Sequence, residues 1–362
     1  MTGTQDQPTG SGVGAARQNL SATRVLYWVF NYMPRWEAVS KEIASLRRGL
    51  EGEIDESLVS INTKDSGFNL SGREKRIPLP HGLPLYPLVM PYASRFDINH
   101  LFASAGERLL TPVLSRSNGV LTIARDTTTL RGFEHNLASL TRLRAIVVQG
   151  ERDREILRQI GIQDEAVRLI RPGIAVEPYR EAYGPFTILF ASSPLNAADF
   201  LSRGIYLITA VAALLPAVRF LLIWRTRHLA KLERIVAAAG PGNITIISGV
   251  VDDMAGVYQG VHATVLPGLE HRSFNPCPRS GLESLAHGKP LLLSHLVSIA
   301  SEVTRAGAGV AFEPTIAGLK AAILQLQGEY SAYQANTQRY IADKFSPAIH
   351  IDLYRQLYRT VA

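Results

Sequence analysis

Short apolar runs rich in β-branched residues alternate with helical segments in the first half of the chain. The run at residues 24–30 predicts a buried first strand, and helical spacing of apolar residues follows it. Further strands are predicted at residues 57–61, 97–102, 119–123, 145–149 and 167–171. Helices are predicted at residues 36–50, 107–114, 136–143 and 152–160. This alternation is typical of a parallel sheet joined by helical crossovers.

The same rhythm restarts after the Pro172-Gly173 pair. Strands are predicted at residues 187–191, 219–224, 244–248, 263–266 and 290–294. Helices are predicted at residues 204–215, 229–239, 252–259, 280–287, 317–326, 330–343 and 349–360. The two series predict an α/β chain with two Rossmann-like, doubly wound parallel sheets. In such sheets ligands bind beyond the carboxyl ends of the strands, here in a cleft between the two domains.

Length and composition agree with two globular domains. A chain of 362 residues exceeds the size at which single cores stop growing, and its 46% hydrophobic content suffices for two cores. The net charge of +7 favours an anionic ligand. The basic residues are scattered and not interleaved with aromatic ones, so a nucleic-acid partner is not expected.

Cysteine and histidine usage limits the chemistry further. Cys277 is the one cysteine, which excludes an intramolecular disulfide and fits a reducing compartment, so we expect a cytoplasmic protein. The histidines lack ligand spacing, and no metal site is expected.

Membrane association is expected to be peripheral at most, because every apolar run is shorter than the ~20 residues that span a bilayer. A basic and apolar stretch is the candidate for such a contact with the inner membrane face or a lipid-linked acceptor, although a solvated loop is the favoured interpretation. Its residues are Lys64, Phe68, Arg73, Lys75, Arg76, Leu79 and Leu83.

The most informative segment, residues 267–294, is a proline-rich loop followed by a helix and a strand. Ser280 is predicted as the N-cap, with Glu283 three positions later as in a capping box. A helix N-terminus at the cleft suits a diphosphate, and Arg279 adds a charge-assisted contact. Glu283, one turn into the helix, is expected to accept hydrogen bonds from ribose hydroxyls. The alternative is that Glu283 serves only the capping box.

This segment resembles the donor-binding signature of a large retaining family of GT-B glycosyltransferases, the family 4 type, typified by sucrose synthases and bacterial polysaccharide glycosyltransferases. The residues from Glu283 to Pro290, E-S-L-A-H-G-K-P, are similar to the second half of that signature. Other stretches of the second half of the chain agree in order and spacing. They are residues 170–174, 249–251, 263–267 and 301–309, and the final helix with Tyr354 and Tyr358.

The resemblance implies a GT-B architecture whose last helix crosses back over the first domain. The expected division is a disordered tail at 1–20, an acceptor domain at 21–172, a donor domain at 173–345 and the returning helix at 346–362. It further implies transfer of a sugar from a nucleotide diphosphate, UDP- or GDP-linked, to a hydroxyl of a glycan, a lipid-linked molecule or a small molecule. The expected reaction is retaining and metal-independent, with no cofactor beyond the donor.

The resemblance also assigns donor-binding roles to residues of the second half. Arg203 stands where the family often has a diphosphate-binding lysine, and Arg225 follows the predicted strand 219–224. Val250 and Val251 lie in the segment whose backbone holds the base in the family. The start of the signature helix completes the set of donor contacts with Pro278, Arg279, Ser280 and Glu283.

The catalytic candidates lie where the sequence departs from the family or matches it less closely. Asn275, eight positions before Glu283, replaces a glutamate that lies near the transferred sugar in the family. In the first domain Asp126 and His100 are the candidates near the reacting sugar, and Arg125 is a candidate phosphate or acceptor contact. The alternatives are a helix-capping role for Asp126 and a structural role for His100.

Other functions on the same fold stay open at this point. One is a nucleotide-sugar epimerase, and another is a sugar phosphorylase, which the few C-terminal lysines do not favour as pyridoxal carriers. A third is a non-catalytic protein that binds another transferase, an alternative that Asn275 keeps open.

Overall fold

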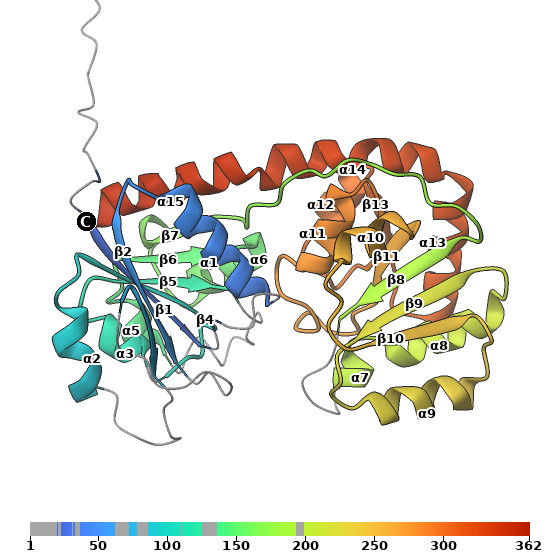
Figure 1. Cartoon of the computed structure of the whole chain (residues 1–362), viewed down its shortest axis with the longest axis horizontal. Coiled ribbons are helices and arrows are strands. Elements are labelled where there is room, and N and C mark those ends of the chain that lie inside the picture. The colour runs from blue at the N-terminus through green and yellow to red at the C-terminus, as the bar shows by residue number, and fades with distance from the viewer. Residues whose placement is uncertain are drawn as a thin grey trace, which may run out of the picture.

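The computed structural model describes residues 20, 23–30, 32, 37–61, 72–77, 86–108, 110–124, 136–192 and 199–362. The statements below refer to these residues. They form two parallel sheets that lie side by side, each flanked by helices (Figure 1).

The first sheet has the strand order β3-β2-β1-β4-β5-β6-β7 and is parallel throughout. Its strands are β1 (Arg24–Phe30), β2 (Asp55–Ile61), β3 (Glu74–Ile77), β4 (Ile98–Ala103), β5 (Gly119–Ile123), β6 (Ala145–Val148) and β7 (Val167–Leu169). The helices are α1 (Ala38–Gly49), α2 (Tyr86–Ala93), α3 (Thr111–Leu114), α5 (Leu137–Leu140), α6 (Glu151–Gln159) and the short η2 (Asp164–Ala166). The order reverses direction between β1 and β4, where doubly wound folds form their crevice.

The second sheet has the order β10-β9-β8-β11-β12-β13 and is also parallel. Its strands are β8 (Thr187–Ala191), β9 (Arg219–Trp224), β10 (Ile244–Ser248), β11 (Ala263–Leu266), β12 (Leu291–Ser294) and β13 (Gly309–Phe312). The helices are α7 (Asp199–Ser202), α8 (Ile205–Leu214), α9 (Leu229–Ala239), α10 (Met254–Gln259), α11 (Arg279–Ala286), α12 (Ala300–Arg305), α13 (Ile316–Gly328), α14 (Tyr330–Phe345) and α15 (Pro347–Val361).

The last helix, α15, packs on the first domain although it follows the second in sequence (Figure 1). Its apolar face joins the core between α1 and the first sheet. The contributing side chains are Ile351, Tyr354, Leu357 and Tyr358, all buried. The predicted fold class, two Rossmann-like sheets with a returning C-terminal helix, is therefore confirmed.

The chain crosses between the domains twice, and the two crossings touch. On the outward crossing, Ile174 donates its backbone N–H to the carbonyl oxygen of Phe345, at 2.7 Å, just before α15 begins. A Cβ at Gly173 would lie 3.0 Å from the Cα of Pro347, so only glycine allows this approach without a shift. Beside it, Arg171 forms an ion pair of 2.8 Å with Glu302 of α12. The limits predicted for the domains, at 172 and 345, stay a prediction.

Two local predictions differ from the structure. Part of the basic and apolar stretch from Lys64 to Leu83, for which a solvated loop is the favoured interpretation, forms β3. The sequence Glu74-Lys75-Arg76-Ile77 carries no apolar pattern because β3 is an edge strand whose side chains are all partly exposed. The helix expected from 107 begins only at Thr111, because the carboxylate of Glu107 accepts the backbone N–H groups of Leu110 and Thr111 ahead of it.

In the described part of the chain, none of the helices is both long and apolar enough to cross a bilayer.

Candidate functional site

The helix at the centre of the predicted site, α11, starts one residue earlier than expected. Pro278 is the N-cap, and its carbonyl oxygen accepts hydrogen bonds from the N–H groups of Gly281 and Leu282. Ser280 therefore lies inside the first turn, and the predicted capping box is wrong. The physical reason is that proline, with fixed φ and no N–H, ends the extended loop directly before the helix.

Glu283 is held by three donors instead of capping the helix. Its Oε1 accepts from Nζ of Lys41 at 2.7 Å and from Nε of Arg279 at 3.0 Å, and its Oε2 accepts from the hydroxyl of Tyr258 at 3.2 Å. Burial disfavours the charged form, but the positive charges of Lys41 and Arg279 outweigh it and lower the pKa of Glu283 below its usual value. The site thus contains an ionised carboxylate largely shielded from water.

Lys41 is the member of this group that comes from the first domain. It lies one turn after Glu37, the N-cap of α1, and Glu37 forms a second ion pair across the domain boundary, 2.5 Å from Nη1 of Arg225. The first turn of α1 faces the second domain in Figure 1. Sequence reasoning missed both residues. The i, i+4 spacing of Glu37 and Lys41 indicates a shared polar face but says nothing about what that face meets.

Arg225 leaves the carboxyl end of β9 next to the segment predicted to hold the base. Gly249 donates its N–H to the carbonyl oxygen of Trp224 at 2.8 Å, with a φ of 103°, which favours glycine. Val250 follows and is half exposed, whereas Val251 packs against the buried cluster that contains Tyr258. The structure therefore brings Arg225, the Val250–Val251 backbone and, through Tyr258, Glu283 to the same edge of the second sheet.

Arg203 lies beside the loop between β11 and α11. Its guanidinium donates to the hydroxyl of Ser192 and stacks over the ring of Phe274, 5.7 Å from the centroid. The neighbouring Ser202 carbonyl accepts from the N–H of Leu269 at 2.7 Å and from the hydroxyl of Ser273 at 2.6 Å. These bonds fix the α7–α8 turn, and Arg203 with it, against the loop that carries Asn275.

Asn275 and Cys277 of the same loop touch the first domain. Nδ2 of Asn275 lies 3.5 Å from the carbonyl oxygen of Ala124, directly after β5, and Sγ of Cys277 lies 3.3 Å from that of Gln149, after β6. The loop thus bridges to the carboxyl ends of two strands of the first sheet, where a doubly wound fold places its ligand. Asp126 and Arg125, the candidates that follow Ala124, lie outside the described residues.

His100 lies elsewhere, in the core under α15. It is fully buried, and its ring nitrogens bond the hydroxyl of Tyr358 at 2.6 Å and that of Thr122 at 2.7 Å. Burial lowers the pKa of His100 to about 3, so the ring is neutral. The prediction that it acts near the reacting sugar does not fit this position, because the returning helix covers it. The structural alternative fits.

Two buried carboxyl groups lie behind the loop. Glu42 accepts two hydrogen bonds from Nε2 of Gln149, at 2.8 and 3.0 Å. Asp153 of α6 is fully buried, and in the described parts of the chain neither of its oxygens has a hydrogen-bond partner. Burial raises the pKa of each group to about 7. Nothing in the sequence marks them, because acidic residues on amphipathic helices are usually solvated.

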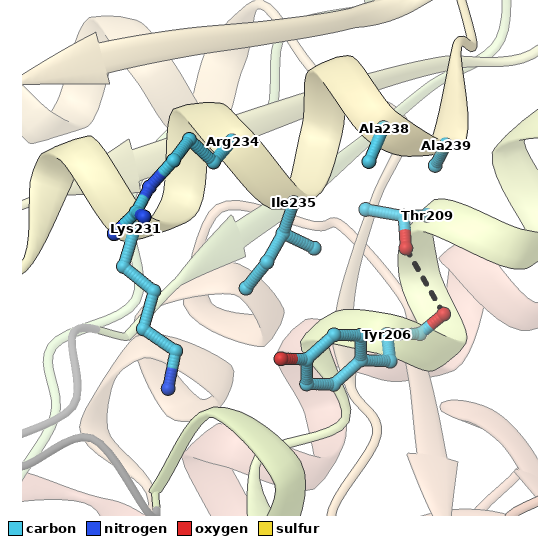
Figure 2. Close-up of a pocket in the computed structure, with 7 residues that line it drawn as sticks. All are labelled: Tyr206, Thr209, Lys231, Arg234, Ile235, Ala238 and Ala239. Atoms are coloured by element: carbon cyan, nitrogen blue, oxygen red, sulfur yellow. Dashed lines mark hydrogen bonds between the residues drawn. The ribbon is translucent and has the colours of Figure 1, made fainter.

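A separate groove of about 490 Å³ lies between α8 and α9 (Figure 2). None of the predicted site residues lines it, so it is not the candidate site. Its lining residues are Tyr206, Thr209, Lys231, Arg234, Ile235, Ala238 and Ala239. Within the described ranges, no three His, Cys, Asp or Glu side chains are grouped so that they would hold a metal ion.

Comparison with solved structures agrees with this geometry. The fold is similar to sucrose-phosphate synthase from Thermosynechococcus elongatus, with a TM-score of 0.73 at 15% identity, over 93% of this chain and 99% of that one. It is similar to HepE of Anabaena in complex with UDP and glucose, with a TM-score of 0.73 at 14% identity, over 92% and 99%. A glycosyltransferase from Rickettsia africae matches with a TM-score of 0.69 at 13% identity, over 94% and 98%.

No protein-family model matches the chain, and a search of curated proteins finds no relative. At these identities the structural likeness defines the fold, which is that of the GT-B glycosyltransferases.

Proposed function

We propose that the protein transfers a sugar from a nucleotide-diphosphate donor, UDP- or GDP-linked, to a hydroxyl group of a glycan, a lipid-linked molecule or a small molecule. The observation that carries the proposal is the ionised, shielded carboxylate of Glu283 at the domain boundary, with Arg279 beside it and Arg225 at the end of β9. One anion and several cations at the carboxyl edge of a GT-B donor sheet suit a ribose joined to a diphosphate.

The proposal assigns a group of the protein to the ribose, the base and the diphosphate of the donor. The carboxylate of Glu283 accepts hydrogen bonds from the ribose hydroxyls, and the backbone at Val250 and Val251 contacts the base. Three guanidinium groups, of Arg203, Arg225 and Arg279, bind the diphosphate together with the N-terminal turn of α11 at Pro278–Ser280. The fold similarity to HepE, solved with UDP and glucose, supports a UDP-linked donor.

In the proposed reaction the bond between C1 of the sugar and the β-phosphate oxygen breaks, and the acceptor oxygen bonds to C1. The transition state has oxocarbenium character, and the electron pair of the broken bond leaves with the diphosphate. Cations held in place before the reaction stabilise this departing charge without a metal ion. The leaving phosphate takes the acceptor proton on the same face of the sugar, which gives retention.

Asn275 and Asp126 complete the proposal on the side of the transferred sugar. Asn275 is neutral where the resembling family has a carboxylate, so its amide orients sugar hydroxyls without adding charge. We place the enzyme in the cytoplasm, since its one cysteine, Cys277, is a free thiol, which fits a reducing compartment. A peripheral membrane contact would bring a lipid-linked acceptor to the same site.

A thermal-shift screen with UDP, GDP, dTDP and ADP and their sugar conjugates tests the proposal, because a ligand that binds only the folded state raises the Tm. We expect a shift with one nucleotide diphosphate that Glu283→Gln abolishes. The matched control is Glu313→Gln, whose side chain is 75% exposed and lies 3.4 Å from Nδ1 of His295. Absence of a shift with every nucleotide would contradict the proposal, and conversion of the donor sugar without transfer would indicate the epimerase.

A further inference from the structure

Helix α1 presents two opposite charges to the second domain, one turn apart. Glu37 pairs with Arg225, and Lys41 pairs with Glu283. Each partner in the second domain is a group that the proposed function assigns to the donor, and the inference below rests on that proposal. The carboxylate of Glu37 is bound to the guanidinium of Arg225, which is proposed to bind phosphate. The ammonium of Lys41 donates to a carboxylate proposed to accept from ribose.

The chemistry of the two pairs matches that of the donor groups. A carboxylate oxygen on a guanidinium replaces a phosphate oxygen, since both are anionic acceptors for the same planar donor. An N–H donor on the carboxylate of Glu283 replaces a ribose hydroxyl. In the absence of a donor, α1 therefore satisfies both ends of the site with side chains of its own.

The ion pairs of α1 are not what joins the domains. The returning helix α15 buries four large side chains in the core of the first domain, and the Arg171–Glu302 pair and the Ile174–Phe345 hydrogen bond tie the two crossings together. The Glu37–Arg225 pair is open to water, with side chains 36% and 46% exposed. Exposed pairs of this kind add little to stability, so a role in holding the domains does not explain the Glu37–Arg225 pair.

We propose that the first turns of α1 occupy the donor site until a nucleoside diphosphate displaces Glu37 from Arg225 and Lys41 from Glu283, and that Lys41 then binds the diphosphate. Lys41 and Arg279 donate to the same Oε1 of Glu283, so the ammonium already lies beside a guanidinium proposed to bind phosphate. After the exchange, Lys41 is a cation that the first domain contributes to the donor, and Glu37 is its competitor.

Calorimetric titration of each variant with a nucleoside and the matching nucleoside diphosphate, uridine with UDP or guanosine with GDP, tests this assignment. We expect Lys41→Met to weaken diphosphate binding about tenfold, because a charge-assisted contact is lost, while nucleoside binding stays equal or tightens. Lys41→Arg should restore most of the loss. Glu37→Gln should tighten diphosphate binding about threefold or more, because the carboxylate of Glu37 no longer competes for Arg225.

The control is Arg48→Met, which removes one exposed positive charge from the same helix and should leave both affinities unchanged. Equal diphosphate affinity of wild type and Lys41→Met, or an equal loss for nucleoside and diphosphate, would overturn this inference and leave the proposed function standing. Failure of the wild type to bind any nucleoside diphosphate would overturn both.

Discussion

Nζ of Lys41 and Oε1 of Glu283 lie 2.7 Å apart although the two residues are 242 positions apart in the chain. The contact joins α1 of the first domain to α11 of the second domain, the helix that carries the donor signature. Because the same oxygen also accepts from Arg279, the charge state of Glu283 depends on both domains. A site of this kind is complete only when the two domains are in contact.

Gly204→Ala should lower both the Tm and nucleotide affinity. Gly204 has a φ of 71°, and a Cβ there would lie 2.1 Å from the carbonyl oxygen of Pro267, so the turn that places Arg203 must shift. The expected loss is about 2–4 kcal/mol of unfolding free energy, from backbone strain and the displaced contact. Gly240→Ala is the control, because Gly240 has a φ of 68° and no described atom would lie within 4 Å of the new Cβ. Equal losses of unfolding free energy in the two variants would show that backbone strain alone, and not the contact with Pro267, causes the effect.

Asp153→Asn should stabilise the protein at pH 8, progressively less as the pH falls, and have little effect below about pH 4. Burial raises the pKa of Asp153 from 3.8 to about 7, so the folded state keeps a proton that the unfolded chain releases between these values. The stability due to this proton is complete at low pH and is lost as the pH rises through about 7. The loss is at most about 4 kcal/mol.

Chemical denaturation of wild type and Asp153→Asn at several pH values between 5 and 8 measures this effect. Glu42 titrates in the same range, so Asp153→Asn should keep part of the pH dependence of stability. The double variant with Glu42→Gln should keep a smaller part of it. Parallel curves for wild type and Asp153→Asn would contradict the assignment of Asp153 as a buried, protonated acid.

His100→Leu should destabilise the protein without changing its affinity for nucleotide. The substitution removes one buried hydrogen-bond partner from each of the hydroxyls of Tyr358 and Thr122, which keep their bonds to Tyr27 and Tyr354. The expected loss is about 1–3 kcal/mol of unfolding free energy. Urea denaturation measures the stability, and titration with UDP or GDP below the transition measures binding. Weaker binding by a variant that is fully folded would return His100 to the site.

Asn275→Ala should lower donor turnover about tenfold or more and leave nucleoside diphosphate affinity unchanged. The amide contacts the carbonyl oxygen of Ala124 at the carboxyl end of β5, in the first domain, and we assign it to the transferred sugar. Hydrolysis of the sugar nucleotide followed by release of the diphosphate gives turnover without knowledge of the acceptor. A loss of UDP or GDP affinity in the same variant would place Asn275 with the diphosphate contacts instead.

Most of the fold was predictable because buried parallel strands carry their own pattern. Segments such as Arg24–Phe30 and Ala263–Leu266 are apolar on both faces, which happens only when helices cover both sides of a sheet. The resemblance of residues 283–290 added the GT-B architecture and the return of α15. The pattern failed at Glu74–Ile77, because an edge strand with charged side chains has no apolar run to detect.

By itself the sequence determined the two sheets, the order of their elements and the loop and helix that carry Asn275, Arg279 and Glu283, since all of these depend on local periodicity and on residues close together in the chain. Tertiary structure alone decided the partners. It buried His100 beneath Tyr358, left Asp153 enclosed, and brought Glu37 and Lys41 to Arg225 and Glu283. Such contacts depend on how elements distant in the chain are placed in space, and the local periodicity of a chain carries no information about a partner some two hundred residues away.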